Sequence, residues 1–127
     1  MIQCPFCAPD QARIISSCQC AIAIRDGFPI SEGHSLIIPK SHVQSIFDLE
    51  PEEQRMVWAF VAQVRQQLAI ELKVGAFNIG INDGKEAGQT IEHAHIHVIP
   101  RRPGDVSDPR GGLRLIIPDR ARYWEAK

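Results

Sequence analysis

The stretch "EHAHIHVIP", residues 92–100, places histidines at alternate positions of a short apolar run. In a β-strand, residues two apart point to the same face. We therefore expect a strand over 90–100 with His93, His95 and His97 on one face and the apolar residues between them on the core face. Three of the chain's five histidines lie here. That density indicates either a metal site or a phosphate-handling site.

Outward from this run, the sequence predicts one long helix and several more strands. The helix begins at Pro51, which suits a first helical position, and ends before Gly75. Its core-facing stripe has helical spacing and comprises Val57, Val61, Val64, Leu68 and Leu72, with Trp58 and Phe60 beside it. Ser41 is expected to cap a short helical turn. The further strands are predicted at 17–26, 33–42, 76–82 and 113–118.

Strands that meet one helix without regular alternation are typical of an α+β domain. We predict a mostly antiparallel sheet of about five strands, with one long helix on one face and one short helix. The 127 residues suit a single domain over 1–127.

Composition excludes several classes of function. Lysine plus arginine number 14 against 15 acidic residues, a net charge of −1, so nothing favours nucleic acid or an anionic membrane surface. No apolar run reaches the roughly 20 residues of a membrane helix. The start "MIQCPFC" lacks a basic segment followed by an apolar one, so we expect no signal peptide and a cytoplasmic protein.

The loop before the histidines favours phosphate chemistry. "DGKEAGQT", residues 83–90, has small residues and backbone N–H groups that can surround an anion. A neutral imidazole held in one tautomer can attack phosphorus and carry a nucleotidyl group. His95 lies between the other two histidines and is the natural nucleophile. The alternatives are three solvated histidines on an open sheet and a metal bound by all three.

The cysteines leave three interpretations open. "CPFC", residues 4–7, can be a redox pair, two inert thiols, or half of a tetrahedral zinc site that needs two more ligands. Cys18 and Cys20 alternate on the strand predicted over 17–26, and we interpret them as packing residues.

The run "HAHIHV" resembles the motif of the histidine triad (HIT) superfamily. The segment "NDGKEAGQTIEHAHIHVIPR" (82–101) is similar to the fragile-histidine-triad branch, which hydrolyses dinucleoside polyphosphates. "GHSLIIPKSH" (33–42) and "RDGFPISEGH" (25–34) extend the resemblance over a core of about residues 4–104, leaving 105–127 as a C-terminal extension.

This resemblance implies roles for individual residues. His95 would attack the α-phosphate, His97 would contact the phosphate and the bridging oxygen, and His34 would support them. Asp26 would bind the ribose hydroxyls, although Asp26 and Asn82 can also be plain turn residues. The residues implied at the phosphate oxygens or the leaving group are Asn82, Gln89 and Thr90.

The resemblance also bears on metals and partners. Many bacterial triad proteins pair an N-terminal CxxC with two histidines, which here implies structural zinc on Cys4, Cys7, His42 and His93. Mg²⁺ would arrive only with the substrate. The chain is expected to cleave a dinucleoside polyphosphate or a nucleoside phosphoramidate at the α-phosphate, and to form a homodimer. The alternative is a nucleotide-binding sensor with little turnover. Three arginines, Arg101 and Arg102 just before the extension and Arg110 within it, are interpreted as solvated surface rather than as polyphosphate ligands.

Overall fold

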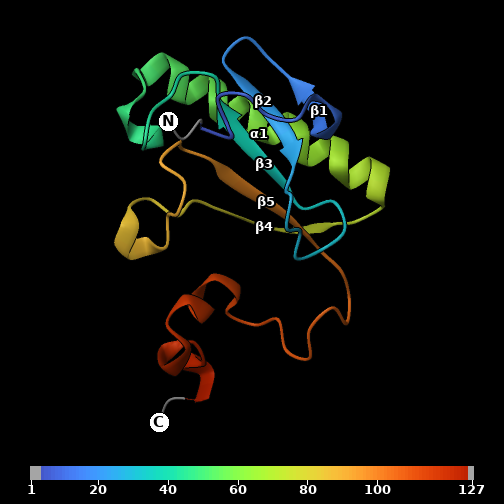
Figure 1. Cartoon of the computed structure of the whole chain (residues 1–127). Coiled ribbons are helices and arrows are strands. Elements are labelled where there is room, and N and C mark those ends of the chain that lie inside the picture. The colour runs from blue at the N-terminus through green and yellow to red at the C-terminus, as the bar shows by residue number, and fades with distance from the viewer. Residues whose placement is uncertain (1–3, 126–127) are drawn as a thin grey trace.

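A computed structural model describes residues 4–125 and shows one sheet with a long helix across one of its faces (Figure 1). Residues 1–3 and 126–127, the two ends of the predicted domain, lie outside the described residues. The sheet contains β1 (Ile14–Ser17), β2 (Ala21–Arg25), β3 (Ser35–Pro39), β4 (Ala76–Gly80) and β5 (Ile96–Arg101). Their order is β1-β2-β3-β5-β4, and every neighbouring pair is antiparallel. The predicted five-stranded antiparallel sheet is confirmed.

The single α-helix among the described residues, α1 (Pro51–Leu72), packs on one face of the sheet. Val57, Val61, Val64 and Leu68 are buried as predicted, against strand residues that include Ala23, Ile37 and Val98. Because strand residues alternate, the neighbours of these strand residues point to the other face. There Ile24 and Leu36 form a smaller cluster with Phe6, and this second face carries the site.

The remaining helical segments are short 3-10 helices of three to five residues. The short helix predicted before α1 is η2 (Ile46–Asp48), but its cap is Ser45 rather than Ser41. The others are η1 (Gln11–Arg13), η3 (Lys85–Ala87), η4 (Gly112–Ile116), η5 (Pro118–Arg120) and η6 (Tyr123–Glu125). None of the helices among residues 4–125 has the length and apolar character needed to cross a bilayer.

The predicted histidine strand was too long, because β5 begins only at Ile96. The carbonyl of Pro39, at the end of β3, accepts a hydrogen bond from the ring of His93 rather than from a backbone N–H. The backbone N–H of Ala94 donates to Val43 in the loop before α1. His93 and His95 therefore precede the sheet ladder, and only His97 lies within it.

Two other strand predictions need correction. The strand predicted over 17–26 is confirmed only in its second half, as β2, while its first half is the turn of a hairpin, since the Cys18 N–H donates to the Ala21 carbonyl. Cys18 and Cys20 therefore lie at the turn, although they pack against the core as expected. Residues 113–118 form helical turns instead of a last strand. The positive φ of Gly111 and Gly112 turns the chain there, and Arg114 donates to carbonyls further along the same segment.

The helix ends before Gly75 as predicted, but Gly75 is not the residue that ends it. The last helical residue is Leu72, and Lys73 adopts the left-handed conformation with φ 55°. Trp58 lies on the outer side of the helix and is 42% exposed, whereas Phe60 is buried.

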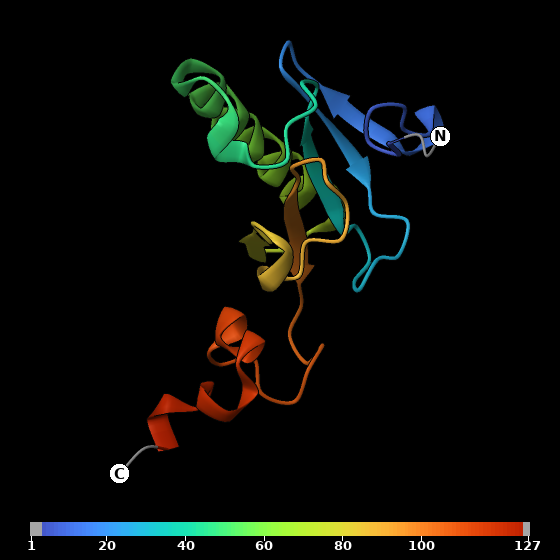
Figure 2. The ribbon, with the colours of Figure 1, turned by 60° about the vertical axis from the view of Figure 1, so that its left-hand side comes forward.

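Residues 105–125 lie apart from α1, on the β4 side of the molecule (Figures 1 and 2).

We expect Leu68→Ala to lower the free energy of unfolding by about 2–5 kcal/mol, because it leaves a cavity between α1 and the sheet. Ile70→Ala, two residues along the same helix at a 67% exposed position, should change it by less than about 0.5 kcal/mol. Urea denaturation of both variants measures the difference. Similar losses in the two variants would contradict the assigned helix face.

Candidate functional site

A cavity of about 800 Å³ opens on the sheet face opposite α1. Its lining crosses the sheet from the residues after β2, over β3 and β5, to β4. Among the predicted site residues, the cavity is lined by Asp26, His34, Asn82, Thr90, His95 and His97. The fold thus brings together residues from four separate parts of the sequence.

His34 and His97 form a hydrogen-bonded pair at the floor of this cavity. The Nε2 of His34 lies 2.9 Å from the Nδ1 of His97. The Nδ1 of His34 accepts the backbone N–H of Ile30, so His34 carries its proton on Nε2 and donates it to His97. His97 accepts on Nδ1, which leaves its Nε2–H free to donate into the cavity.

Burial keeps this pair neutral. It lowers the pKa of His97 to about 4, with His95 and His34 adding to the effect and Asp26 opposing it. Burial likewise lowers the pKa of His34, again against the nearby Asp26 carboxylate, whose Oδ2 lies 3.3 Å from the His34 Nε2. Asp26 Oδ1 accepts the backbone N–H of Phe28, so this carboxylate also closes the turn after β2. Asp26 therefore combines the turn role with a position on the cavity wall.

His95 is held in the opposite tautomer. Its Nδ1 lies 2.9 Å from the backbone carbonyl of His93, and a carbonyl can only accept, so the proton of His95 is on Nδ1. The Nε2 of His95 then keeps its lone pair. The ring lies edge-on to Phe6 and to His97, with ring centroids 5.0 and 5.2 Å apart. The ring of His95, with an unprotonated Nε2, thus lies next to the ring of His97.

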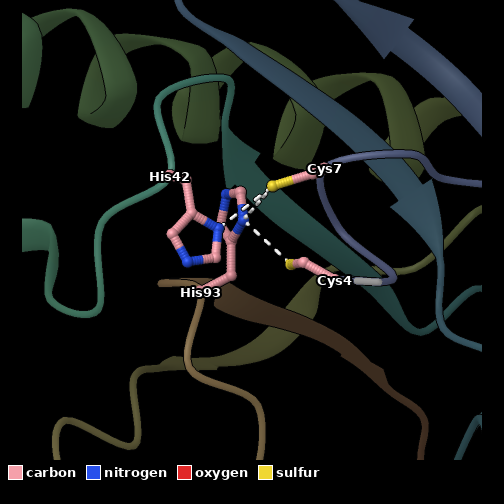
Figure 3. A group of neighbouring side chains, drawn as sticks. All are labelled: Cys4, Cys7, His42 and His93. Carbon is pink, nitrogen blue, oxygen red and sulfur yellow. Dashed lines mark hydrogen bonds between the residues drawn. The ribbon is translucent and has the colours of Figure 1, made fainter. Parts of the chain in front are cut away.

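His93 belongs to a different cluster from His97. Its ring is fully buried, its Nε2 donates to the Pro39 carbonyl, and its Nδ1 lone pair points to the thiols of Cys4 and Cys7 at 3.4 and 3.6 Å (Figure 3). His42 approaches Cys7 with its Nδ1 at 3.0 Å. The four ligand atoms lie within 4.8 Å of one another, so Cys4, Cys7, His42 and His93 can hold a metal ion.

The loop between β4 and β5 is shaped by Gln89. The Gln89 side chain accepts the backbone N–H of Gly84 and donates to the carbonyls of Gln44 and Ile91. It does not line the cavity, and its contact with phosphate stays a prediction. Thr90 and Asn82 are exposed at the cavity mouth, where their side chains are accessible to a ligand.

Several residues of the cavity were not found by sequence reasoning. Phe6 comes from the middle of "CPFC", Arg13 from η1, and Leu113 and Ile116 from the C-terminal extension. No motif singles them out, because apolar side chains and a lone arginine are common at any surface. The three arginines named in the sequence pair with acidic neighbours: Arg101 with Asp105, Arg102 with Glu32, and Arg110 with Asp108.

Residues 10–104 match the family model of the HIT domain, and the chain belongs to that family. It is 42% identical over 80 residues to an asymmetrical bis(5'-nucleosyl)-tetraphosphatase of Schizosaccharomyces pombe, which covers 63% of this chain and 44% of that protein. It is 34% identical to a bis(5'-adenosyl)-triphosphatase of Dictyostelium discoideum over 75% of this chain and 64% of the relative.

A solved structure agrees with this assignment. The crystal structure of a HIT family protein from Bacillus anthracis superposes with a TM-score of 0.68 at 34% identity, over 72% of this chain and 65% of that one. The matched part of this chain spans 44% and 64% of the lengths of the two named phosphatases. The HIT match starts after "CPFC", so the two cysteines lie outside the matched region.

The hydrogen bonds predict which nitrogen of each ring carries its proton. In ¹⁵N-histidine spectra at neutral pH, His95 should be the Nδ1–H tautomer and His97 the Nε2–H tautomer, with His97 titrating at about pH 4. The pKa of an unperturbed histidine is 6.5, so between about pH 4 and pH 6.5 the folded chain binds fewer protons at His97 than the unfolded chain does. Its contribution to stability therefore falls as pH drops from about 6.5 to about 4. A proton on Nδ1 of His97 would contradict the assigned hydrogen-bond direction.

Proposed function

We propose that this protein is a hydrolase that cleaves a nucleotide at its α-phosphate through a covalent nucleotidyl-histidine on His95. The substrate class is a dinucleoside polyphosphate or a nucleoside phosphoramidate, and the named relatives favour the former. The single observation that carries the proposal is the pair of opposite tautomers: a lone pair on His95 beside an N–H on His97.

In the first step, the Nε2 of His95 attacks the α-phosphorus and the bond from phosphorus to the leaving-group oxygen breaks. The leaving group departs with the electrons of that bond. The Nε2–H of His97 donates a hydrogen bond to the phosphate or to the bridging oxygen, where negative charge develops. Thr90 and Asn82, at the cavity mouth, supply further donors. Asp26 accepts from the ribose hydroxyls.

In the second step, water attacks the same phosphorus and releases the nucleoside monophosphate. The modified His95 ring still holds its Nδ1–H against the His93 carbonyl, so it is cationic until the phosphorus–nitrogen bond breaks. It then leaves as a neutral imidazole, which makes it a good leaving group, and the proton of the water passes to solvent. The enzyme returns to its starting state.

His95→Ala should lower kcat for a diadenosine polyphosphate by at least about 1000-fold, because it removes the nucleophile. Rapid quenching followed by mass spectrometry should find a nucleotide adduct on His95 in the unmodified chain. Glu92→Ala, an exposed neighbour in the same segment, is the control and should keep both turnover and adduct. Nucleotide binding without turnover of either substrate class would instead identify a sensor.

We further propose that the cluster of Cys4, Cys7, His42 and His93 holds a structural zinc ion. Zinc–sulfur and zinc–nitrogen bonds of about 2.3 and 2.0 Å in a tetrahedron put ligand atoms about 3.5 Å apart. Three of the four distances from cysteine sulfur to histidine nitrogen are 3.0, 3.4 and 3.6 Å, and all four ligand atoms lie within 4.8 Å of one another. His93 also has the required tautomer, because its Nε2–H donates to Pro39 and its Nδ1 is free to bind metal. Four protein ligands leave no open position for a substrate.

Cys7→Ser should lose most of the bound zinc and lower the melting temperature, because one of four ligands is removed. Cys18→Ser is the matched control, since Cys18 lies outside the cluster. Elemental analysis and thermal unfolding of both variants measure the outcome. Zinc that survives Cys7→Ser but disappears in His97→Ala would move the metal to the histidines of the cavity.

We also propose that the chain forms a homodimer. The outer edge of β4 has no partner strand among the described residues, and Trp58 on α1 is an exposed apolar side chain. Exposed apolar groups and a free strand edge are common features of interaction surfaces. Sedimentation equilibrium gives the mass directly.

A further inference from the structure

The C-terminal extension reaches the cavity of its own chain. Leu113 and Ile116, both on η4, line the same cavity as His95 and His97. A Cβ built on Gly80 would lie 3.8 Å from the Cδ2 of Leu113, which is ordinary contact distance. Gly80 pairs with His97 across β4 and β5. Leu113 therefore lies next to Gly80, the β4 residue that pairs with His97.

The order of the strands gives the cavity a direction. Asp26 follows β2 and Leu36 is on β3, His97 and Ile99 are on β5, and Asn78 and Gly80 are on β4. Crossing the sheet from β2 to β4 leads from the Asp26 end, past the imidazoles, to η4. A substrate whose α-phosphate lies at His95 and whose ribose lies at Asp26 must extend its leaving group toward β4 and η4.

Side-chain contacts hold the extension at this end of the cavity. Arg101 donates to Asn78 at 2.6 Å and to Asp105 at 2.8 Å, which joins β5, β4 and the start of the extension. Further along, the guanidinium of Arg114 donates to the Ala121 carbonyl and lies 4.8 Å from the ring centre of Tyr123. Both Arg114 contacts fix the turn that carries Leu113. Leu113 and Ile116 thus belong to a folded segment.

From this arrangement we infer that Leu113 and Ile116 form an apolar subsite for the leaving group, selecting substrates whose leaving group ends in an aromatic or otherwise apolar body. This inference rests on the proposed hydrolysis at the α-phosphate. Leu113 is 58% exposed and Ile116 80% exposed, so both have apolar surface that such a group can bury. Neither side chain offers a hydrogen bond or a charge to a small polar leaving group. The nucleobase of the second nucleoside in a dinucleoside polyphosphate is one such aromatic group.

Two esters of ADP separate this subsite from the rest of the reaction. The β-methyl and β-benzyl esters have the same phosphoanhydride bond and the same adenosine, and differ only in the apolar bulk of the leaving group. Leu113→Ala should lower kcat/KM for the benzyl ester by about tenfold, as expected for the loss of one apolar contact, and leave the methyl ester within about twofold. Ile116→Ala should act in the same direction.

Leu115→Ala is the matched control, because Leu115 is on the same turn, is 54% exposed and does not line the cavity. It should leave kcat/KM for both esters unchanged. An equal loss for the two esters in Leu113→Ala, or the same loss in Leu115→Ala, would overturn the subsite. An unmodified chain that turns over neither ester, nor a diadenosine polyphosphate, nor an adenosine phosphoramidate would overturn the proposed hydrolysis itself.

Discussion

The hydrogen bond from the Nδ1–H of His95 to the backbone carbonyl of His93 connects the cavity with the cluster of Cys4, Cys7, His42 and His93. The same residue, His93, donates from its ring to the end of β3 and directs its other ring nitrogen to the thiols. A movement of the backbone at His93 would therefore remove both the hydrogen bond that fixes the tautomer of His95 and the contacts of His93 with the cysteines. The catalytic proposal and the zinc proposal both depend on this one residue being buried and held at three points.

Burial lowers the pKa of histidines both in the cavity and at the cysteine cluster. In the cavity it lowers the pKa of His34 and His97, so these rings stay neutral and their hydrogen bonds have one direction. A charged His97 would lose its acceptor nitrogen and, with it, the bond from His34. At the cysteine cluster, burial of His93 also lowers its pKa, which keeps a lone pair available for a metal. Neutral imidazole is thus the state that both sites need.

Much of the fold could be predicted from local patterns, and the errors have physical causes. The stripe of α1 was correct because a helix face follows directly from residue spacing. The histidine strand was too long because nothing in the sequence says that a side chain of His93 replaces a backbone donor at Pro39. The final strand failed because "LRLII" has strand composition, while Gly111 and Gly112 turn the chain and Arg114 bonds within the segment.

The sequence by itself predicted the class of fold and the candidate nucleophile from residue types at short, regular spacing, and the family from the resemblance of the run "HAHIHV" to a known motif. Only the tertiary structure decided which nitrogen of each histidine carries the proton. The tautomers depend on carbonyls and N–H groups from distant segments, such as the N–H of Ile30 and the carbonyl of Pro39. Leu113 and Ile116 likewise line the cavity only because the chain after β5 folds back toward it. Such a contact between distant segments has no signature in the local sequence.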